Sequence, residues 1–212
     1  MPRHVVFLRA INVAGHATVK MRDVLEVFVS AGGRNVRTYS QSGNVVFDAP
    51  GSRAQAVLLK TRGQLRRPLG EEPEIFHRTV RELDRIVRAT PFGDLTGHRE
   101  LKLYVVFLSR KPAATAALPI ASAKERLEIV ATHGREAFVV SRRKDNGFYG
   151  FPNTFVEQAL GVRATSRNWS TVTKLAEFTR GLEAPGASRT LAGRKGGRRE
   201  KRAPLPPEDE VG

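Results

Sequence analysis

The order of apolar segments in the first 80 residues constrains the fold more than any other feature of the chain. Residues 4–10 are rich in Val, Phe and Leu, which indicates a strand buried on both faces. Residues 21–28 repeat apolar side chains at helical spacing until a Gly-Gly pair ends the predicted helix. Two strands follow at residues 35–40 and 44–48, and Ser42-Gly43 between them predicts a tight turn in which glycine takes a positive φ.

The next three segments complete a recognisable order of elements. Residues 52–69 predict a helix, residues 73–78 a short strand and residues 81–89 another helix. The order strand, helix, strand, strand, helix, strand is the split βαβ pattern of ferredoxin-like folds.

A second set of elements begins after the segment 90–100, which is rich in Pro, Gly and polar residues and is the best candidate for a boundary. The predicted elements are a strand at 101–108, a short helix at 112–118, a hairpin of strands 127–132 and 137–142, and helices at 153–160 and 169–180.

We therefore expect an α+β protein of two ferredoxin-like (split βαβ) subdomains with antiparallel or mixed sheets, a C-terminal helix and a disordered tail. The expected boundaries are 1–92 and 100–181 for the subdomains and 182–212 for the tail, which has too few large apolar residues to order itself.

The chain carries a formal net charge of +15 at pH 7, and the excess is not confined to the tail. The residues before Glu183 include 29 basic and 16 acidic side chains, a net charge of +13. A basic body favours nucleic acid or another polyanion as partner. The competing interpretation is an arginine-rich composition spread over solvated faces, because no dense run of Lys or Arg occurs before the tail.

Several classes of protein are disfavoured by what the sequence lacks. It has no cysteine, so disulfides, thiolate zinc sites and cysteine nucleophiles are excluded. Its five histidines show no metal-ligand spacing, and it has no GxxxxGK[ST] or GxGxxG motif, so we expect neither a metal nor a cofactor. No apolar run approaches the ~20 residues of a membrane span or the core of a signal peptide, and we expect a cytoplasmic protein.

Polar residues gather at one predicted edge of the first sheet. In a split βαβ unit the first two strands run in the same direction, so Arg9 and Asn12 should approach Gln41, Ser42 and Asn44 beyond the second strand. Long loops on a rigid sheet often carry binding residues, and these side chains would bond a ligand. The alternative is turn chemistry, in which Gln41 and Asn44 only brace the loop backbone.

A second polar group stands at the start of the last predicted helix. Asn168 or Ser170 is a good helix cap, and Arg167 and Lys174 lie just before and one turn inside the helix. Free backbone N–H groups and two cations would bind a phosphate or carboxylate there. Alternatively Asn168 only caps, Trp169 anchors the helix and Arg167 pairs with a local acid.

The strings "LRAINVAG", "VRTYSQSGNVVF" and "ATSRNWSTVTKL" resemble the bacterial family known as domain of unknown function 1697 over about residues 4 to 178. The resemblance implies a compact α+β protein with two related subdomains and no established activity. The motif positions that it marks for testing are Arg9, Asn12, Gly15, Tyr39, Gln41, Ser42, Gly43, Asn44, Arg167, Asn168, Trp169, Thr171 and Lys174.

Three functions remain open at this point. The first is a binding protein for a phosphorylated or carboxylated, nucleotide-like small ligand, held by Arg9, Asn12, Tyr39, Gln41, Ser42, Asn44, Arg167, Asn168 and Lys174. The second is nucleic-acid binding through the basic body and tail. The third is an enzyme that uses Tyr39, Lys174 or Arg167 as a polar catalyst. The sequence predicts no oligomeric state.

Overall fold

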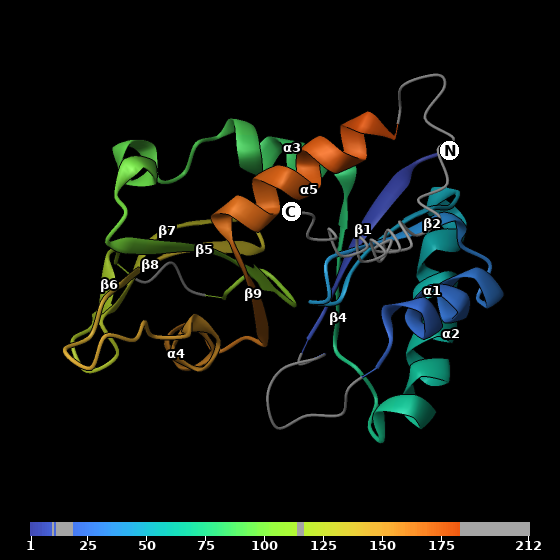
Figure 1. The fold of residues 1–212 in the computed structure, drawn as a ribbon, viewed down its shortest axis with the longest axis horizontal. Helices are drawn as coiled ribbons and strands as arrows, with labels where there is room; N and C mark the ends of the chain where they lie inside the picture. Colours follow the sequence, from blue (N-terminus) through green and yellow to red (C-terminus); the bar gives the residue numbers. More distant parts are fainter. Residues whose placement is uncertain (10, 12–18, 114–116, 183–212) are drawn as a thin grey trace, which may run out of the picture.

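The protein is a mixed α+β structure with two antiparallel sheets that lie side by side (Figure 1). The computed structural model describes residues 1–9, 11, 19–113 and 117–182. The expected disordered tail, 182–212, lies outside the described residues except for Leu182. Among the described residues no helix has both the length and the apolar character needed to cross a membrane.

The first sheet has the strand order β2-β3-β1-β4. Its strands are β1 (Arg3–Leu8), β2 (Arg34–Tyr39), β3 (Asn44–Asp48) and β4 (Ile75–Thr79), with helices α1 (Met21–Ser30) and α2 (Gly51–Leu69) in the connections. Because β1 and β2 are both antiparallel to β3, they run in the same direction. The end of β1 therefore meets the β2–β3 loop, where the Leu8 N–H donates to the Gly43 carbonyl at 2.8 Å.

The second sheet has the order β6-β7-β8-β5-β9. Its strands are β5 (Leu101–Leu108), β6 (Ile120–Ser122), β7 (Leu127–His133), β8 (Glu136–Arg142) and β9 (Ala164–Asn168), and α4 (Pro152–Leu160) precedes β9. Two further helices, α3 (Val80–Arg88) and α5 (Trp169–Gly181), each follow the last strand of their half directly. A short 3-10 helix, η1 (Gly93–Gly97), lies in the expected boundary segment.

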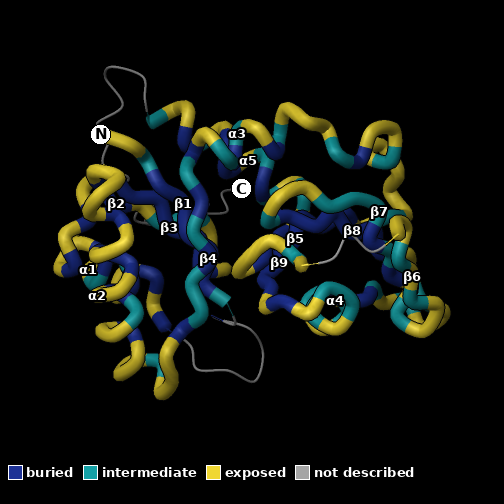
Figure 2. Tube along the Cα trace, turned by 180° about the vertical axis from the view of Figure 1, so that it is seen from behind, coloured by how far each residue is buried: buried dark blue, intermediate teal, exposed yellow. Residues whose placement is uncertain are grey.

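Both faces of each sheet are covered, which explains why strands such as β1 and β5 contain runs of consecutive apolar residues. Side chains of β1 and β3 such as Val6 and Phe47 pack under α1 and α2, and those of β5 and β8 such as Val106 pack against α4. The opposite faces of both sheets contribute to one shared cluster with α3 and α5. The buried residues form a nearly continuous band through the two sheets (Figure 2).

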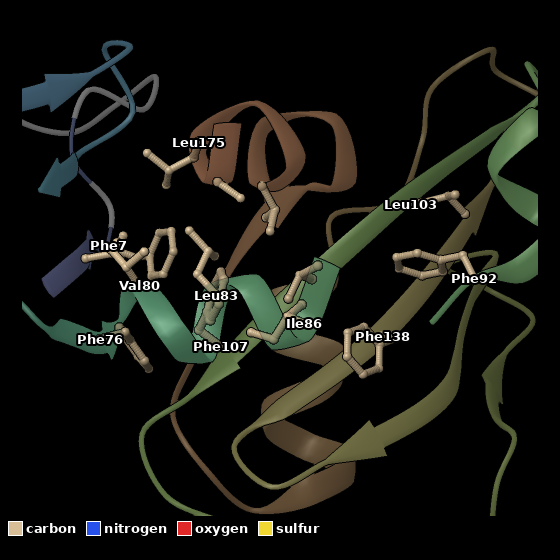
Figure 3. Close-up of a cluster of buried hydrophobic side chains, with 14 of the residues drawn as sticks. Phe7, Phe76, Val80, Leu83, Ile86, Phe92, Leu103, Phe107, Phe138 and Leu175 are labelled. Carbon is tan, nitrogen blue, oxygen red and sulfur yellow. The ribbon is translucent and has the colours of Figure 1, made fainter. Parts of the chain in front are cut away.

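The shared cluster packs apolar side chains of both halves against one another (Figure 3). At its centre the rings of Phe7 on β1 and Phe107 on β5 stack with centroids 3.8 Å apart and planes inclined by 14°. Leu83 and Leu175, from α3 and α5, are fully buried in the same cluster. Burial of this apolar surface holds the halves together at roughly 25 cal/mol per Å².

Three expectations about the elements were wrong or incomplete. The helix expected at 112–118 lies partly outside the described residues, and the described positions 112–113 and 117–118 are not helical. Strands β6 and β9 were not predicted, and for β9 the reason is that "ATSRN" is mostly polar and does not alternate.

A pair of histidines links the outer part of β1 to β4. The side chain of His4 is buried beside the ring of Phe47, and its Nε2 lies 3.1 Å from the Ala49 carbonyl, so Nε2 carries the proton. The Nδ1 of His4 must then accept from Nε2 of His77, 2.9 Å away. Burial, followed by the nearby His4, lowers the pKa of His77 to about 4, against an opposing effect of Glu82.

We predict that the free energy of unfolding falls as the pH drops from 6.5 toward 4. In that window His77 is protonated in the unfolded chain and stays neutral in the folded one, so acid favours unfolding. His77→Gln, which keeps a donor for His4, should reduce the loss between about pH 7.5 and pH 5 by roughly 1.5 kcal/mol. Denaturant unfolding at the two pH values measures this loss of free energy of unfolding. The control is His133→Gln, a change at an exposed histidine. Equal losses in both variants would contradict the assignment.

Candidate functional site

The side chain of Arg167, on β9, crosses from the second half of the molecule into the first. Its Nε donates to the Asn44 side-chain oxygen at 2.6 Å, and one terminal nitrogen donates to the carbonyls of Leu8 and Ser42. The other terminal nitrogen donates to Thr165 Oγ1 and the Ser166 carbonyl. All five N–H groups of the guanidinium are therefore used within the protein.

Asn44 explains why the β2–β3 loop needs an amide at this position. Its oxygen accepts from Arg167, while its nitrogen donates to the Tyr39 carbonyl at 3.1 Å and to the Ser42 hydroxyl at 3.0 Å. The side chain is fully buried. A carboxylate lacks the donor and a hydroxyl lacks the reach, so only an amide side chain serves both partners.

Gly43 is required by geometry as well as by conformation. Its φ is +71°, and a Cβ at this position would lie 3.0 Å from Leu8 Cβ and 3.2 Å from the Leu8 carbonyl oxygen. Four residues separate Tyr39 from Asn44, and Ser40 among them also has a positive φ of 59°. The expected two-residue turn was therefore wrong. Close contact with the end of β1 thus accounts for the Ser-Gly-Asn sequence.

A second buried arginine makes the reciprocal connection from the first half to the second. Arg78 holds the fourth position of β4, as Arg167 does in β9, and donates to the carbonyls of Leu108 and Arg135. Its Nε donates to the Glu136 carboxylate, which begins β8 as Asn44 begins β3. Each guanidinium carbon lies 5.5 Å from the centroid of one ring of the central Phe7–Phe107 stack.

The two clusters differ in charge. Arg78 has the Glu136 carboxylate as counter-ion, whereas the described partners of Arg167 are an amide, a hydroxyl and backbone carbonyls. Burial alone lowers the pKa of Arg167 to about 10, still well above neutrality, so the side chain remains a cation. Arg167 is therefore a buried positive charge without an acidic partner among the described residues.

Arg9 belongs to a separate, charge-balanced network. Its guanidinium bonds Glu74 at 3.0 Å and also Glu157, and Arg163 reaches the same two acids. Burial of Glu157 opposes ionisation, but hydrogen bonds from Arg9 and the Ala164 N–H outweigh it and lower the pKa of this carboxyl. Two cations and two carboxylates thus cancel, and the network adds a connection between the halves.

A cavity of about 400 Å³ lies where these elements meet. Leu8, Arg9 and Ser42 line it from the first half, and β9 contributes Thr165, Ser166, Arg167 and Asn168. Thr171 of α5 and Asn153 and Thr154 of α4 complete its polar lining. Ile11, Tyr104 and Phe151 form the apolar part, with the rings of Tyr104 and Phe151 edge to face at 6.2 Å.

Two polar atoms of this lining are buried without a hydrogen-bond partner in the described structure. They are the hydroxyl of Ser166, a residue only 6% exposed, and the side-chain oxygen of Asn153. A buried polar group without a partner costs about 1–3 kcal/mol. Both atoms have almost no accessible surface, so a ligand in the cavity would relieve that cost only after a rotation of the side chain. No cluster of three metal-ligating side chains occurs within the described ranges.

The structure brings some of the predicted site residues together and separates others. Arg9, Ser42, Arg167 and Asn168 line the cavity, and Asn44 lies directly behind Arg167. Lys174 is exposed on α5 and Tyr39 packs against Phe178, so neither lies in the cavity lining.

The expectations for Gln41, Asn168 and Asn12 have different outcomes. Gln41 is exposed in the β2–β3 loop. Asn168 occupies the N-cap position of α5, but its side chain makes no capping hydrogen bond, contrary to the expectation. Asn12 lies outside the described residues.

Sequence reasoning missed the lining residues Tyr104, Phe151, Asn153, Thr154, Thr165 and Ser166. Thr165 and Ser166 stand beside Arg167 and would have been found had 164–168 been identified as a strand. The others come from β5 and α4, and no local signal in those segments indicates that they face β9.

We predict that Glu136→Gln lowers the free energy of unfolding by about 2 kcal/mol or more, because it leaves buried Arg78 without its counter-ion. Glu128→Gln is the matched control, since Glu128 pairs with half-exposed Arg142, and it should cost less than about 0.5 kcal/mol. Urea unfolding measures both. Equal effects of the two changes would show that the buried pair contributes no more than a surface pair.

Comparison with known proteins places the chain in a family without assigning it an activity. The structure of the conserved bacterial protein SP0830 from Streptococcus pneumoniae is similar over 83% of this chain and 97% of that one, with a TM-score of 0.53 and 15% identity, which supports the fold alone. No curated protein matches. The family model described as a protein of unknown function, DUF1697, matches residues 1–138, so Arg167 lies beyond the matched part. The chain belongs to the DUF1697 family.

Proposed function

We propose that the protein binds a small phosphorylated or carboxylated organic molecule in the cavity between its two halves. The observation that carries this proposal is the positive charge of Arg167, which lines the cavity and has no carboxylate among its described partners. A buried cation is costly unless an anion compensates it. A ligand anion in the cavity would supply that compensation.

The cavity lining supports the same proposal. The N–H groups of Arg167 are all engaged, so the guanidinium would act on the ligand through its field, and direct hydrogen bonds would come from the Ser166 hydroxyl and from Asn168 and Thr171. The start of α5 adds the partial positive charge of a helix N-terminus. Tyr104 and Phe151 offer an apolar wall for the body of the ligand.

The test is a thermal-shift and calorimetric screen of the full chain against sugar phosphates, nucleotides and organic acids. Because the Ser166 hydroxyl is buried without a partner, Ser166→Ala should raise the melting temperature of the free protein or leave it unchanged, and should weaken binding of any hit by about tenfold. Lys174→Ala, a change at an exposed cation outside the cavity, should leave binding unchanged. A screen without hits, or hits that depend on Lys174 and not on Ser166, would refute the proposal.

Nucleic-acid binding is the second candidate. It is supported by the net charge of +15 and by the exposed aromatic rings of Phe148 and Phe151, 72% and 61% exposed, near Lys102, which lies over the Tyr149 ring. Labelled single-stranded RNA titrated at two salt concentrations, with and without residues 182–212, tests it. Affinity that survives removal of the tail and falls on Phe148→Ala would favour this candidate, and affinity lost with the tail would reject it.

The finer description of the fold is also a proposal. We propose that 1–92 and 100–181 are two ferredoxin-like subdomains. The order β2-β3-β1-β4 in the first half and the order β7-β8-β5-β9 within the second sheet support it, as do the equivalent positions of Arg78 and Arg167.

A further inference from the structure

Each charged side chain of the cavity lining can be checked for a partner of opposite charge. Arg9 and Arg167 are its charged lining residues, and Arg9 belongs to the network in which two cations face two carboxylates. The remaining charge is that of Arg167 alone, with the partial charge at the start of α5 beside it. The interior of this site therefore lacks one negative charge.

The Arg78 cluster holds the equivalent arginine in a neutralised form, although a cavity of about 370 Å³, lined by Glu136 and Arg135 among others but not by Arg78, also lies beside it. There the equivalent of Asn44 is Glu136, and its carboxylate neutralises the guanidinium inside the protein. Asn44 stands where the other cluster has Glu136, and its amide carries no charge. The positive charge of Arg167 is therefore not neutralised by this side chain, and a ligand would have to neutralise it. The uncompensated arginine is also the one that lines the 400 Å³ cavity, together with two buried polar atoms that lack partners.

We propose that the ligand is a monoanion, a carboxylate attached to a flat apolar body, and not a phosphate dianion. This inference rests on the function proposed above and narrows it. One carboxylate would match the single missing charge, whereas a dianion would leave an excess negative charge in a half-enclosed site. A carboxylate has two oxygens, which Ser166 and the polar groups at the start of α5 can satisfy, and its body would lie against Tyr104 and Phe151.

The test compares three probes that share one ring: benzoate, benzamide and phenyl phosphate, titrated calorimetrically into the full chain at about pH 8, where phenyl phosphate is a dianion. Benzoate should bind at least about tenfold more tightly than either of the others. Phenyl phosphate binding as tightly as benzoate would overturn the monoanion inference and leave the proposed function standing. If none of the probes bound, or if benzamide matched benzoate, the inference would fail, whereas the proposed function would be decided by the wider screen described above.

Two variants change the charge balance in opposite directions. Asn44→Asp places a carboxylate on Arg167, as in the Arg78 cluster, and should weaken benzoate binding by about tenfold with the circular dichroism spectrum unchanged. Glu74→Gln, at a residue about one-third exposed, removes a carboxylate from the Arg9 network and should strengthen phenyl phosphate binding several-fold. Unchanged benzoate affinity in Asn44→Asp overturns the inference. Should that variant not fold, unchanged phenyl phosphate affinity in Glu74→Gln overturns it instead.

Discussion

The reciprocal insertion of two arginines across the central Phe7–Phe107 stack is the interaction on which the rest of the structure depends. Each guanidinium leaves the edge strand of its own sheet and bonds the end of the first strand and the hairpin of the other half. These bonds satisfy backbone carbonyls at the points where the two sheets meet, inside a core in which water could not do so. The same bonds fix the position of β9 and thereby the cavity.

The two clusters differ in how their hydrogen bonds and their charges are satisfied. In the Arg78 cluster the charge is complete, so the side chain serves only to join the halves. In the Arg167 cluster the hydrogen bonds are complete and the charge is not. The guanidinium therefore stays fixed by neutral acceptors while its field extends into the cavity, and under the proposed function this field would attract an anion without movement of the arginine.

The sequence predicted the first half well, because its strands and helices carry strong apolar periodicity and its β2–β3 loop carries glycine where the chain approaches Leu8. It also predicted that the end of β1 and this loop would meet. It did not predict β9, because four of its five residues are polar and they show no alternation with apolar ones. Because no strand was predicted there, Arg167 was placed before a free helix end and expected to bond a ligand directly. In the structure all of its donors are engaged within the protein.

The most direct measurement is the location of a monovalent anion in crystals of the protein soaked in bromide, found from its anomalous scattering. The account predicts a bromide inside the cavity, within hydrogen-bond distance of the Ser166 hydroxyl, with Arg167 still bonded to Asn44. Bromide bound only at exposed arginines, with the cavity free of anion, would contradict the claim that Arg167 makes this cavity an anion site.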